Sequence, residues 1–459
     1  MSAASTEKKD NTELFETMPV PKALASMCVP TVIGQMIVLI YNLADTFFIG
    51  RTGNPYMVAA SSLILPVFNL TNAISAFVGI GGGAMVSRLL GAGRRSDASK
   101  ISAFVVYFGL CVSALYSLIL LLAMNPILHA LGASANTFQF AKQYALWVSV
   151  IGGIPTILQM TMSQLVRAVG HSTHAAVGTS LGGLLNIALD PLFMFVILPK
   201  GHEIIGAGMA TMLSNFISMV YFIVVILALR KKTVLTFSLK NGLPTGKLMR
   251  TMIVGGVPAG TSNLLFDLSQ ILIDRLMTSY GDIPMAAIGI VFKAERIPLN
   301  AGVGICQGMM PLVAYNYTLG DHSRMKKVLN QSRIAGLIVA ALAIVLYELC
   351  APQILHLFIS NTGTEVLGAS FLRIRCLATP FMFMGFHILY FFQGMGKSGT
   401  AFWLAVIRQL ILYMPALLLM NALFHMYGLV WTQLISDFIM TIVSFACYYH
   451  FERKEIRHA

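Results

Sequence analysis

Residues Leu181–Leu198, LGGLLNIALDPLFMFVIL, form an apolar run that contains one charged residue, Asp190. Asn186 lies four residues before Asp190, on the same face of a helix one turn away, and Pro191 follows directly. Proline interrupts the helical hydrogen bonds and leaves a carbonyl oxygen free one turn back. A charged side chain at membrane depth costs about 2.5–3.5 kcal/mol on insertion scales, so this acid predicts a functional site with a partner.

The composition of the chain places this run in a membrane. The 459 residues are 57% hydrophobic and only 11% charged, and the mean hydropathy is +0.77. The apolar runs are about 20 residues long, as in transmembrane helices, and lack the shorter alternating pattern of a membrane β-barrel. The sequence therefore predicts an all-α integral membrane protein. Residues 1–18 hold no apolar stretch, so no cleavable signal peptide is expected.

The hydropathy pattern predicts twelve transmembrane helices, at 20–49, 57–86, 101–124, 141–165, 174–198, 206–229, 250–278, 285–316, 329–349, 368–394, 400–420 and 427–449. With a cytoplasmic N-terminus, most of the 31 lysines and arginines, Arg167 among them, fall in cytoplasmic loops. The positive-inside rule therefore predicts that both termini are cytoplasmic. The expected location is the plasma (inner) membrane of a prokaryote. The net charge of +13 follows from these loops, and no nucleic-acid partner is expected.

The two halves of the chain repeat each other. Pro30 and Gly53 recur as Pro258 and Gly281, both at an offset of 228 residues, and two further pairs share this offset. The expected parts are a cytoplasmic tail (1–19), a first six-helix lobe (20–229), a cytoplasmic linker (230–247), a second six-helix lobe (248–450) and a cytoplasmic C-terminal tail (451–459). Because six is an even number, both bundles insert in the same orientation, related by a pseudo-two-fold axis along the membrane normal.

Four oxygen-bearing side chains fall at similar depth in the outer half of the first lobe: Asp45, Asn186, Asp190 and Thr211. At a rise of 1.5 Å per residue, Asp45 and Thr211 lie about 7–8 Å from the outer ends of their helices, and Asp190 about 12 Å. Two carboxylates, an amide and a hydroxyl suit a Na⁺ ion or a shared proton. Two structural alternatives remain: Asp45 as an acid wetted at the interface, and Asn186 as an interhelical hydrogen-bonding residue.

The second lobe does not duplicate these acids, because Ile273 and Met414 stand opposite Asp45 and Asp190 in the repeat. The candidates for a substrate cavity or a second site are polar residues of the first helix and charges of the second lobe: Gln35, Asn42, Asp267, Asp274, Lys293, Glu295 and Arg296. Arg408 adds a further charge in the eleventh helix. Ion pairing among these charges is the simplest interpretation, and a proton-sensitive site or a contact for charged substrate is the alternative.

Several motifs carry a resemblance to a known family: Pro30 and Gln35 before residues 45–50 (DTFFIG), Asn186-x-x-x-Asp190-Pro191, and Gly208-x-x-Thr211. The chain resembles the MATE (multidrug and toxic compound extrusion) transporters, and is most similar to the DinF-related branch that contains MepA-like multidrug exporters. The resemblance implies a V-shaped pair of bundles that exports organic, often cationic and lipophilic compounds in exchange for Na⁺ or H⁺. It also implies that the coupling cation binds Asp45, Asn186, Asp190 and Thr211. A functional acid of other branches falls nearest to Asp267.

Other functions are weighed against drug export. Lys293, Arg296 and Arg408 favour a flippase or exporter for a lipid-linked or other anionic natural substrate, whereas the acids of the first lobe oppose it. Neither HExxH nor the GxGD element of intramembrane aspartyl proteases occurs, so an enzyme is not expected. The six cysteines lie in or beside apolar runs without CxxC spacing, which predicts packing rather than metal binding. We expect a monomer without a cofactor, with drugs and the lipid bilayer as its partners.

Overall fold

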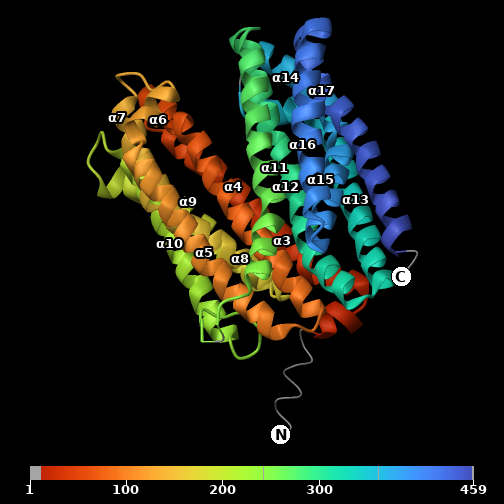
Figure 1. The fold of residues 1–459 in the computed structure, drawn as a ribbon. Helices are drawn as coiled ribbons and strands as arrows, with labels where there is room; N and C mark the ends of the chain where they lie inside the picture. Colours follow the sequence, from red (N-terminus) through yellow and green to blue (C-terminus); the bar gives the residue numbers. More distant parts are fainter. Residues whose placement is uncertain (1–11, 241, 360, 457–459) are drawn as a thin grey trace.

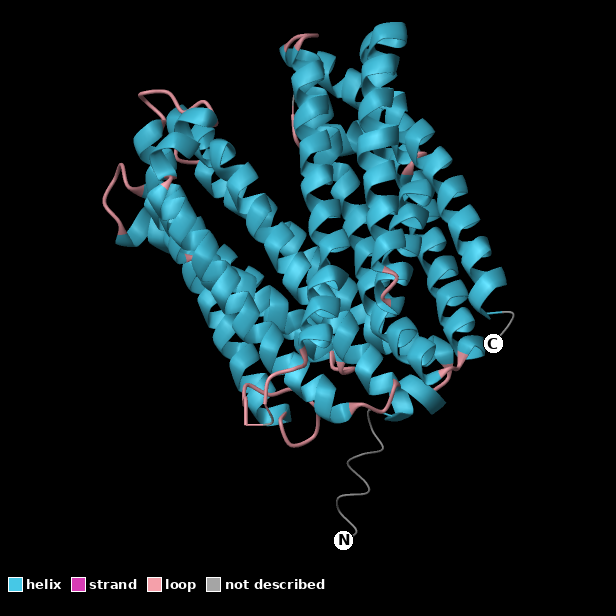
Figure 2. Ribbon diagram, in the orientation of Figure 1, coloured by secondary structure: helices cyan, strands magenta, loops and turns pink. Residues whose placement is uncertain are grey.

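The computed structural model describes residues 12–240, 242–359 and 361–456, and every regular element in this part of the chain is helical (Figure 1, Figure 2). The helices form two bundles that meet at the lower end of the view and separate toward the upper end. The molecule therefore has the shape of a V. The predicted all-α fold of two six-helix bundles is confirmed.

The first lobe follows a short π-helical turn at the N-terminus. Its elements are η1 (Glu13–Thr17), α3 (Val20–Gly50), α4 (Pro55–Gly91), α5 (Arg95–Leu122), α6 (Met124–Ala130), α7 (Phe138–Ala145), η2 (Leu146–Ile151), α8 (Gly153–Ala168), α9 (Ser172–Leu192), η3 (Phe193–Ile197) and α10 (Glu203–Leu229). The predicted helix at 141–165 is bent by 42° between η2 and α8. Gly152 at the break and Pro155 one turn later explain the bend, because both weaken the helical hydrogen bonds.

The second lobe contains longer helices. Its elements are α11 (Gly246–Thr278), α12 (Asp282–Leu319), α13 (His322–His356), α14 (Thr362–Cys376), α15 (Thr379–Met395), α16 (Ser398–Val406), η4 (Ile407–Tyr413), α17 (Met414–Phe451) and η5 (Glu452–Ile456). The tenth predicted helix is α14 and α15, which meet at 46°. The eleventh and twelfth turn into each other at His425, whose backbone is not helical.

Length and apolarity alone identify eight helices in the described residues that could span a membrane, or ten when each bent pair is one span. Two features account for the remaining spans of the predicted twelve. The segment Ser398–Glu455 satisfies the test as one piece, although it contains the turn at His425. Helix α11 does not satisfy it, and it carries Asp267, Asp274 and Arg275.

The lobes contact each other through two equivalent helix pairs. Helix α4 packs against α11, and α3 packs against α12. These are the second and seventh spans and the first and eighth, so one pair becomes the other when the two lobes are exchanged. The contact pattern is the one expected from a pseudo-two-fold axis between the bundles.

Glycines permit the close approach of both pairs. A Cβ at Gly81 of α4 would lie 2.7 Å from the Cα of Gly256 in α11, and a Cβ at Gly308 of α12 would lie 2.7 Å from the Cα of Cys28 in α3. Cys28 and Gly256 are 228 residues apart, which is the offset of the repeat. Small residues are typical of such helix contacts in membranes, because they let two backbones touch.

The N-terminal turn closes the lower end of the V. Phe15 is buried and stacks on Tyr315 of the second lobe with ring centroids 4.6 Å apart. Arg324 of α13 donates hydrogen bonds to the carbonyl oxygens of Leu14, Phe15 and Met18. On the other side, Gly170 of the first lobe lies against Leu14 and Phe15. The turn therefore bridges the two lobes.

Candidate cation site and interlobe cavity

Asp190 and Asn186 lie on one face of α9 and are almost completely buried, as is Thr211 on α10. The Asn186 side-chain nitrogen donates to Asp190 Oδ1 at 3.2 Å and lies 3.3 Å from Thr211 Oγ1. The helix changes to the wider π-helical turn η3 two residues after Pro191. Sequence and structure agree that these three residues form one group.

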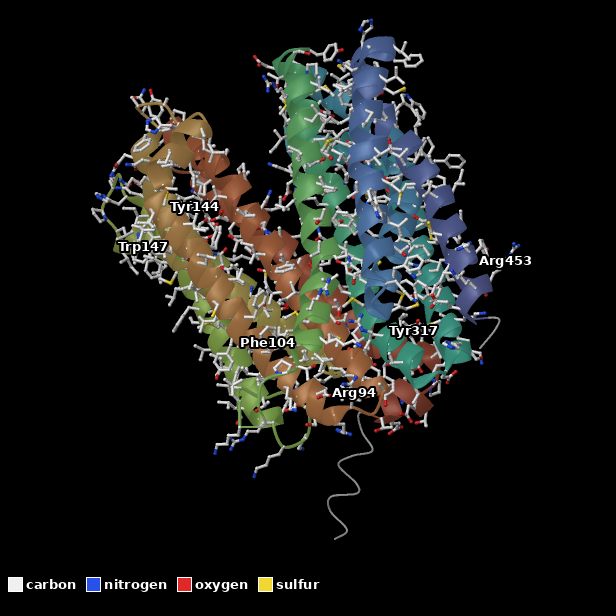
Figure 3. All side chains as sticks on the ribbon, in the orientation of Figure 1. Arg94, Phe104, Tyr144, Trp147, Tyr317 and Arg453 are labelled. Carbon is white, nitrogen blue, oxygen red and sulfur yellow. The ribbon has the colours of Figure 1, made fainter. Side chains whose placement is uncertain are left out.

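Gly208 explains how Thr211 reaches Asn186. A Cβ at Gly208 would lie 2.8 Å from the Cβ of Trp147 in η2, so a larger residue would push α10 away from the fourth span. The Gly208-x-x-Thr211 motif therefore combines a packing position with a threonine that contacts Asn186 one turn later. Figure 3 shows Tyr144 and Trp147 on the same segment of the first lobe.

Asp45 of α3 completes the group through a tyrosine. The Tyr144 hydroxyl donates a hydrogen bond to Asp45 Oδ2 at 3.3 Å. The carboxylates of Asp45 and Asp190 are close enough to interact electrostatically, and both act on Tyr41 and Tyr144. The sequence did not identify these tyrosines as part of the site, although Tyr41 lies one turn before Asp45 on the same helix face.

Three oxygen atoms of this group have no hydrogen-bond donor within the described residues. They are Asp45 Oδ1, Asn186 Oδ1 and Asp190 Oδ2, and all three are buried. Two carboxylate oxygens and an amide oxygen are ligands that a hard cation such as Na⁺ prefers, and a shared proton would also satisfy two of them. The donor set therefore fits a monovalent cation. We refer to Asp45, Asn186, Asp190 and Thr211 as the cation group.

A cavity of about 320 Å³ lies between the lobes. Its walls come from α3, α4, α8 and α9 on one side and from α11, α12 and α15 on the other. Three of the candidate residues line it, namely Gln35, Asp267 and Arg296. Asn42, Asp274, Lys293 and Glu295 are not among its lining residues.

The remaining candidates take other positions. Asn42 is exposed and donates to the Val38 carbonyl of its own helix. Asp274 is half-buried and Lys293 exposed, and no ion pair joins either of them to another described residue. Glu295 forms an ion pair with Arg375 at 2.8 Å, from the Arg375 Nε to the carboxylate.

A polar network in the second lobe contains residues that the sequence did not single out. Arg408 forms an ion pair with Asp437 at 3.0 Å, and Gln433 donates to the same carboxylate. Gln433 Oε1 in turn lies 3.5 Å from Arg375 Nη2. Arg375 and Asp437 fall inside predicted helices, so a charge at membrane depth was the signal that could have identified both.

The structure corrects the position of Arg167. The fourth span was predicted to end at 165, with Arg167 in a cytoplasmic loop, but α8 continues to Ala168 and Arg167 is buried. It lines the interlobe cavity. The sequence alone does not show whether a charged residue just beyond the end of an apolar run is exposed in a loop or buried, because it does not reveal which residues the other lobe covers.

Comparison with known proteins identifies the family. The MatE family model matches residues 30–192 and again 258–419. This protein belongs to the MatE family. The two matches begin at Pro30 and Pro258, which confirms the repeat at the predicted offset of 228.

The relatives include multidrug export proteins named MepA from Staphylococcus saprophyticus and from Staphylococcus aureus, 28% and 26% identical. In each case the match covers 96% of both chains. An outward-facing multidrug resistance MATE family transporter has a TM-score of 0.89 at 20% identity, covering 95% of this chain and 96% of that one. A Vibrio cholerae MATE transporter has a TM-score of 0.88 at 22% identity, covering 98% and 99%.

Proposed function

We propose that this MatE family protein exports lipophilic, often cationic organic compounds in exchange for inward Na⁺ or H⁺. The cation group carries the proposal, because it combines a buried acid, Asp190, and a half-buried acid, Asp45, with three buried oxygen atoms that lack a donor. The names of the Staphylococcus relatives support multidrug export as the activity. The interlobe cavity is the site where we expect the exported compound to bind.

The proposed orientation follows from the lysines and arginines of the loops. Both termini lie in the cytoplasm of a prokaryotic cell, with the tails at 1–19 and 451–459 and the linker at 230–247 on that side. In this orientation the lower end of the V, where the N-terminal turn bridges the lobes, faces the cytoplasm, and the lobes separate toward the outside. The protein acts as a monomer in the plasma membrane and needs no cofactor besides the coupling ion.

Coupling requires that the cation and the drug favour opposite-facing states. A ligand shifts a conformational equilibrium only through its different affinity for the two states. Cation binding to Asp45 and Asp190 removes the repulsion between the two carboxylates, so it stabilises the arrangement of α3, α9 and α10 in which they meet. One cation entering down a potential of 100 mV supplies about 2.3 kcal/mol, which supports roughly fifty-fold accumulation of an exported compound that carries no net charge. When the compound carries one positive charge, its exit uses up this energy, and the concentration gradient of Na⁺ or H⁺ drives the exchange.

Ethidium efflux from energised membrane vesicles tests this function. The wild type should export ethidium, and collapse of either the Na⁺ or the H⁺ gradient should stop it and so identify the ion. Asp190→Asn should abolish gradient-driven export, because the amide cannot balance a cation or carry the proton. Asp274→Asn is the matched control, since this acid of the other lobe lies outside both the cation group and the cavity. Full export by Asp190→Asn at normal expression would overturn the coupling role.

A second candidate is export of a lipid-linked or other anionic natural substrate. Two arginines, Arg167 and Arg296, line the cavity against one acid, Asp267. An apolar groove of about 560 Å³ runs between α3 and α13, but it shares no lining residue with the cavity. Wild-type vesicles that fail to export ethidium under every gradient, yet translocate a fluorescent anionic lipid, would favour this candidate.

A further inference from the structure

The walls of the interlobe cavity carry more positive than negative charge. Among its described lining residues the ionised side chains are Arg167, Arg296 and Asp267, and the other polar groups are mainly amides and hydroxyls. Arg296 is exposed and faces Asp267 electrostatically. This pair can balance itself, so Arg167 is the charge that needs explanation.

Arg167 is held rigidly where the lobes meet. Its Nη1 donates to Gln164 Oε1 at 2.7 Å and to Gln307 Oε1 of the second lobe at 3.1 Å. Gln35 donates to the same Gln307 oxygen at 3.1 Å, and Tyr390 is hydrogen-bonded to Gln307. The guanidinium is therefore fixed by neutral acceptors from both lobes.

No carboxylate balances this arginine within the described residues. Its side chain is only 4% exposed, and the ionisable groups that face it are Tyr390 and Cys28. Its Nε is buried without an acceptor, and no hydrogen bond from Nη2 is found in the described part of the chain. A buried charge without a partner is costly, and buried charges in proteins are normally paired.

We infer that Arg167 is the residue of the cavity that binds the carboxylate, or a similar oxygen anion, of an exported compound. This inference rests on the proposed export function and narrows its substrate class. The Nη2 atom of Arg167 is not among the buried atoms and has no hydrogen-bond partner in the described residues, so it can donate a charge-assisted hydrogen bond to a carboxylate oxygen.

Equilibrium binding of two matched dyes tests the inference. Rhodamine 110 carries a free carboxylate, and rhodamine 123 is its methyl ester with the same cationic ring system. The affinity of the purified full-length protein for each dye is measured by fluorescence anisotropy, for the wild type, Arg167→Gln, Arg167→Lys and Arg296→Gln. Arg296→Gln is the control, because it removes an equal charge from the same cavity.

We expect Arg167→Gln to weaken rhodamine 110 binding about tenfold or more, the effect of one charge-assisted hydrogen-bonded pair, and to change rhodamine 123 binding less than about twofold. Arg167→Lys should lose less, because it keeps the positive charge but not the planar guanidinium. Arg296→Gln should leave the ratio of the two affinities unchanged. Unchanged rhodamine 123 binding also demonstrates that the variant is folded.

A purely structural role for Arg167 predicts a different pattern. Equal loss of both dyes in Arg167→Gln, no loss of either, or failure of the wild type to bind rhodamine 110 would overturn the inference. Binding does not require transport, so the proposed export function fails separately. That failure would be a wild type that binds rhodamine 110 through Arg167 but moves neither dye across vesicle membranes under any gradient.

Discussion

At the scale of single residues, the cation group can bind a cation because neighbouring side chains leave three of its oxygen atoms without a hydrogen-bond donor. Asn186 uses its amide nitrogen on Asp190 and Thr211, which leaves its oxygen free beside two carboxylate oxygens that also lack donors. Tyr144 supplies one hydrogen bond to Asp45 and no more. A group designed only for stability would satisfy these acceptors, because unpartnered buried oxygens are costly.

His425 is the second residue whose conformation departs from the norm. Its φ of 52° and ψ of −139° place it in a region that favours glycine, at the turn between the last two spans. We expect His425→Gly to stabilise the protein by about 1 kcal/mol. Relief of the backbone strain contributes about 1–3 kcal/mol, and the greater conformational entropy of glycine in the unfolded chain cancels part of this gain. Thermal unfolding in detergent measures the change.

His425→Ala is the control, because alanine removes the imidazole but keeps the strained backbone. A melting temperature for the alanine variant equal to or above that of the glycine variant would show that backbone strain at this position does not determine stability.

At the scale of elements, the close contact between α4 and α11 depends on glycines, which have no side chain. A methyl group at Gly256 would collide with the carbonyl oxygen of Phe77 in α4. We expect Gly256→Ala to destabilise the protein by about 1–3 kcal/mol and to reduce export, because α4 and α11 must move apart to make room for the methyl group. Thermal unfolding and ethidium efflux measure the two effects.

Gly255 offers a control from the same turn of α11. A methyl group there would meet its nearest atoms at 3.9 Å, which is ordinary contact. Gly255→Ala should be neutral or stabilising, because alanine favours a helix by about 1 kcal/mol over glycine. Equal behaviour of the two alanine variants would contradict the close helix contact.

The N-terminal turn is the element that ties the lower ends of the lobes together. Arg324→Ala removes the hydrogen bonds to the carbonyls of Leu14, Phe15 and Met18. We expect amide hydrogen exchange in residues 13–18 to become at least about tenfold faster, which corresponds to about 1.4 kcal/mol of lost local stability. Arg453→Ala, at an exposed arginine of the C-terminal turn (Figure 3), should leave this exchange unchanged. Protection that survives in Arg324→Ala would mean that Phe15 packing alone holds the turn.

At the scale of the whole molecule, the sequence predicted the features that depend only on the position of a residue along the chain and on its depth in the membrane. Hydropathy located the twelve spans, the offset between Pro30 and Pro258 revealed the repeat, and depth grouped Asn186, Asp190 and Thr211. Contacts between lobes could not be predicted, because one sequence does not show which face of a helix meets another bundle. Arg167 therefore looked like a loop residue.

The same limit explains the charges of the second lobe. Ion pairing was predicted among the charges that the sequence singled out in the second lobe. Glu295 and Arg408 are paired, but with Arg375 and Asp437, which lie outside that set. Depth restricts the possible partners of a charge to a layer of the membrane, whereas rotation of each helix about its axis selects among them. That rotation is set by packing.

The central claim is that movement of a cation through the cation group is coupled to movement of drug in the opposite direction. The most direct test uses purified protein in liposomes, where an ethidium gradient is the only driving force and an internal dye reports Na⁺ or H⁺. Because coupling is reciprocal, the ethidium gradient should drive one of these cations in the opposite direction in the wild type and in Asp274→Asn, but not in Asp190→Asn. Ethidium flux without counter-movement of either cation, or counter-movement that persists in Asp190→Asn, would contradict the account.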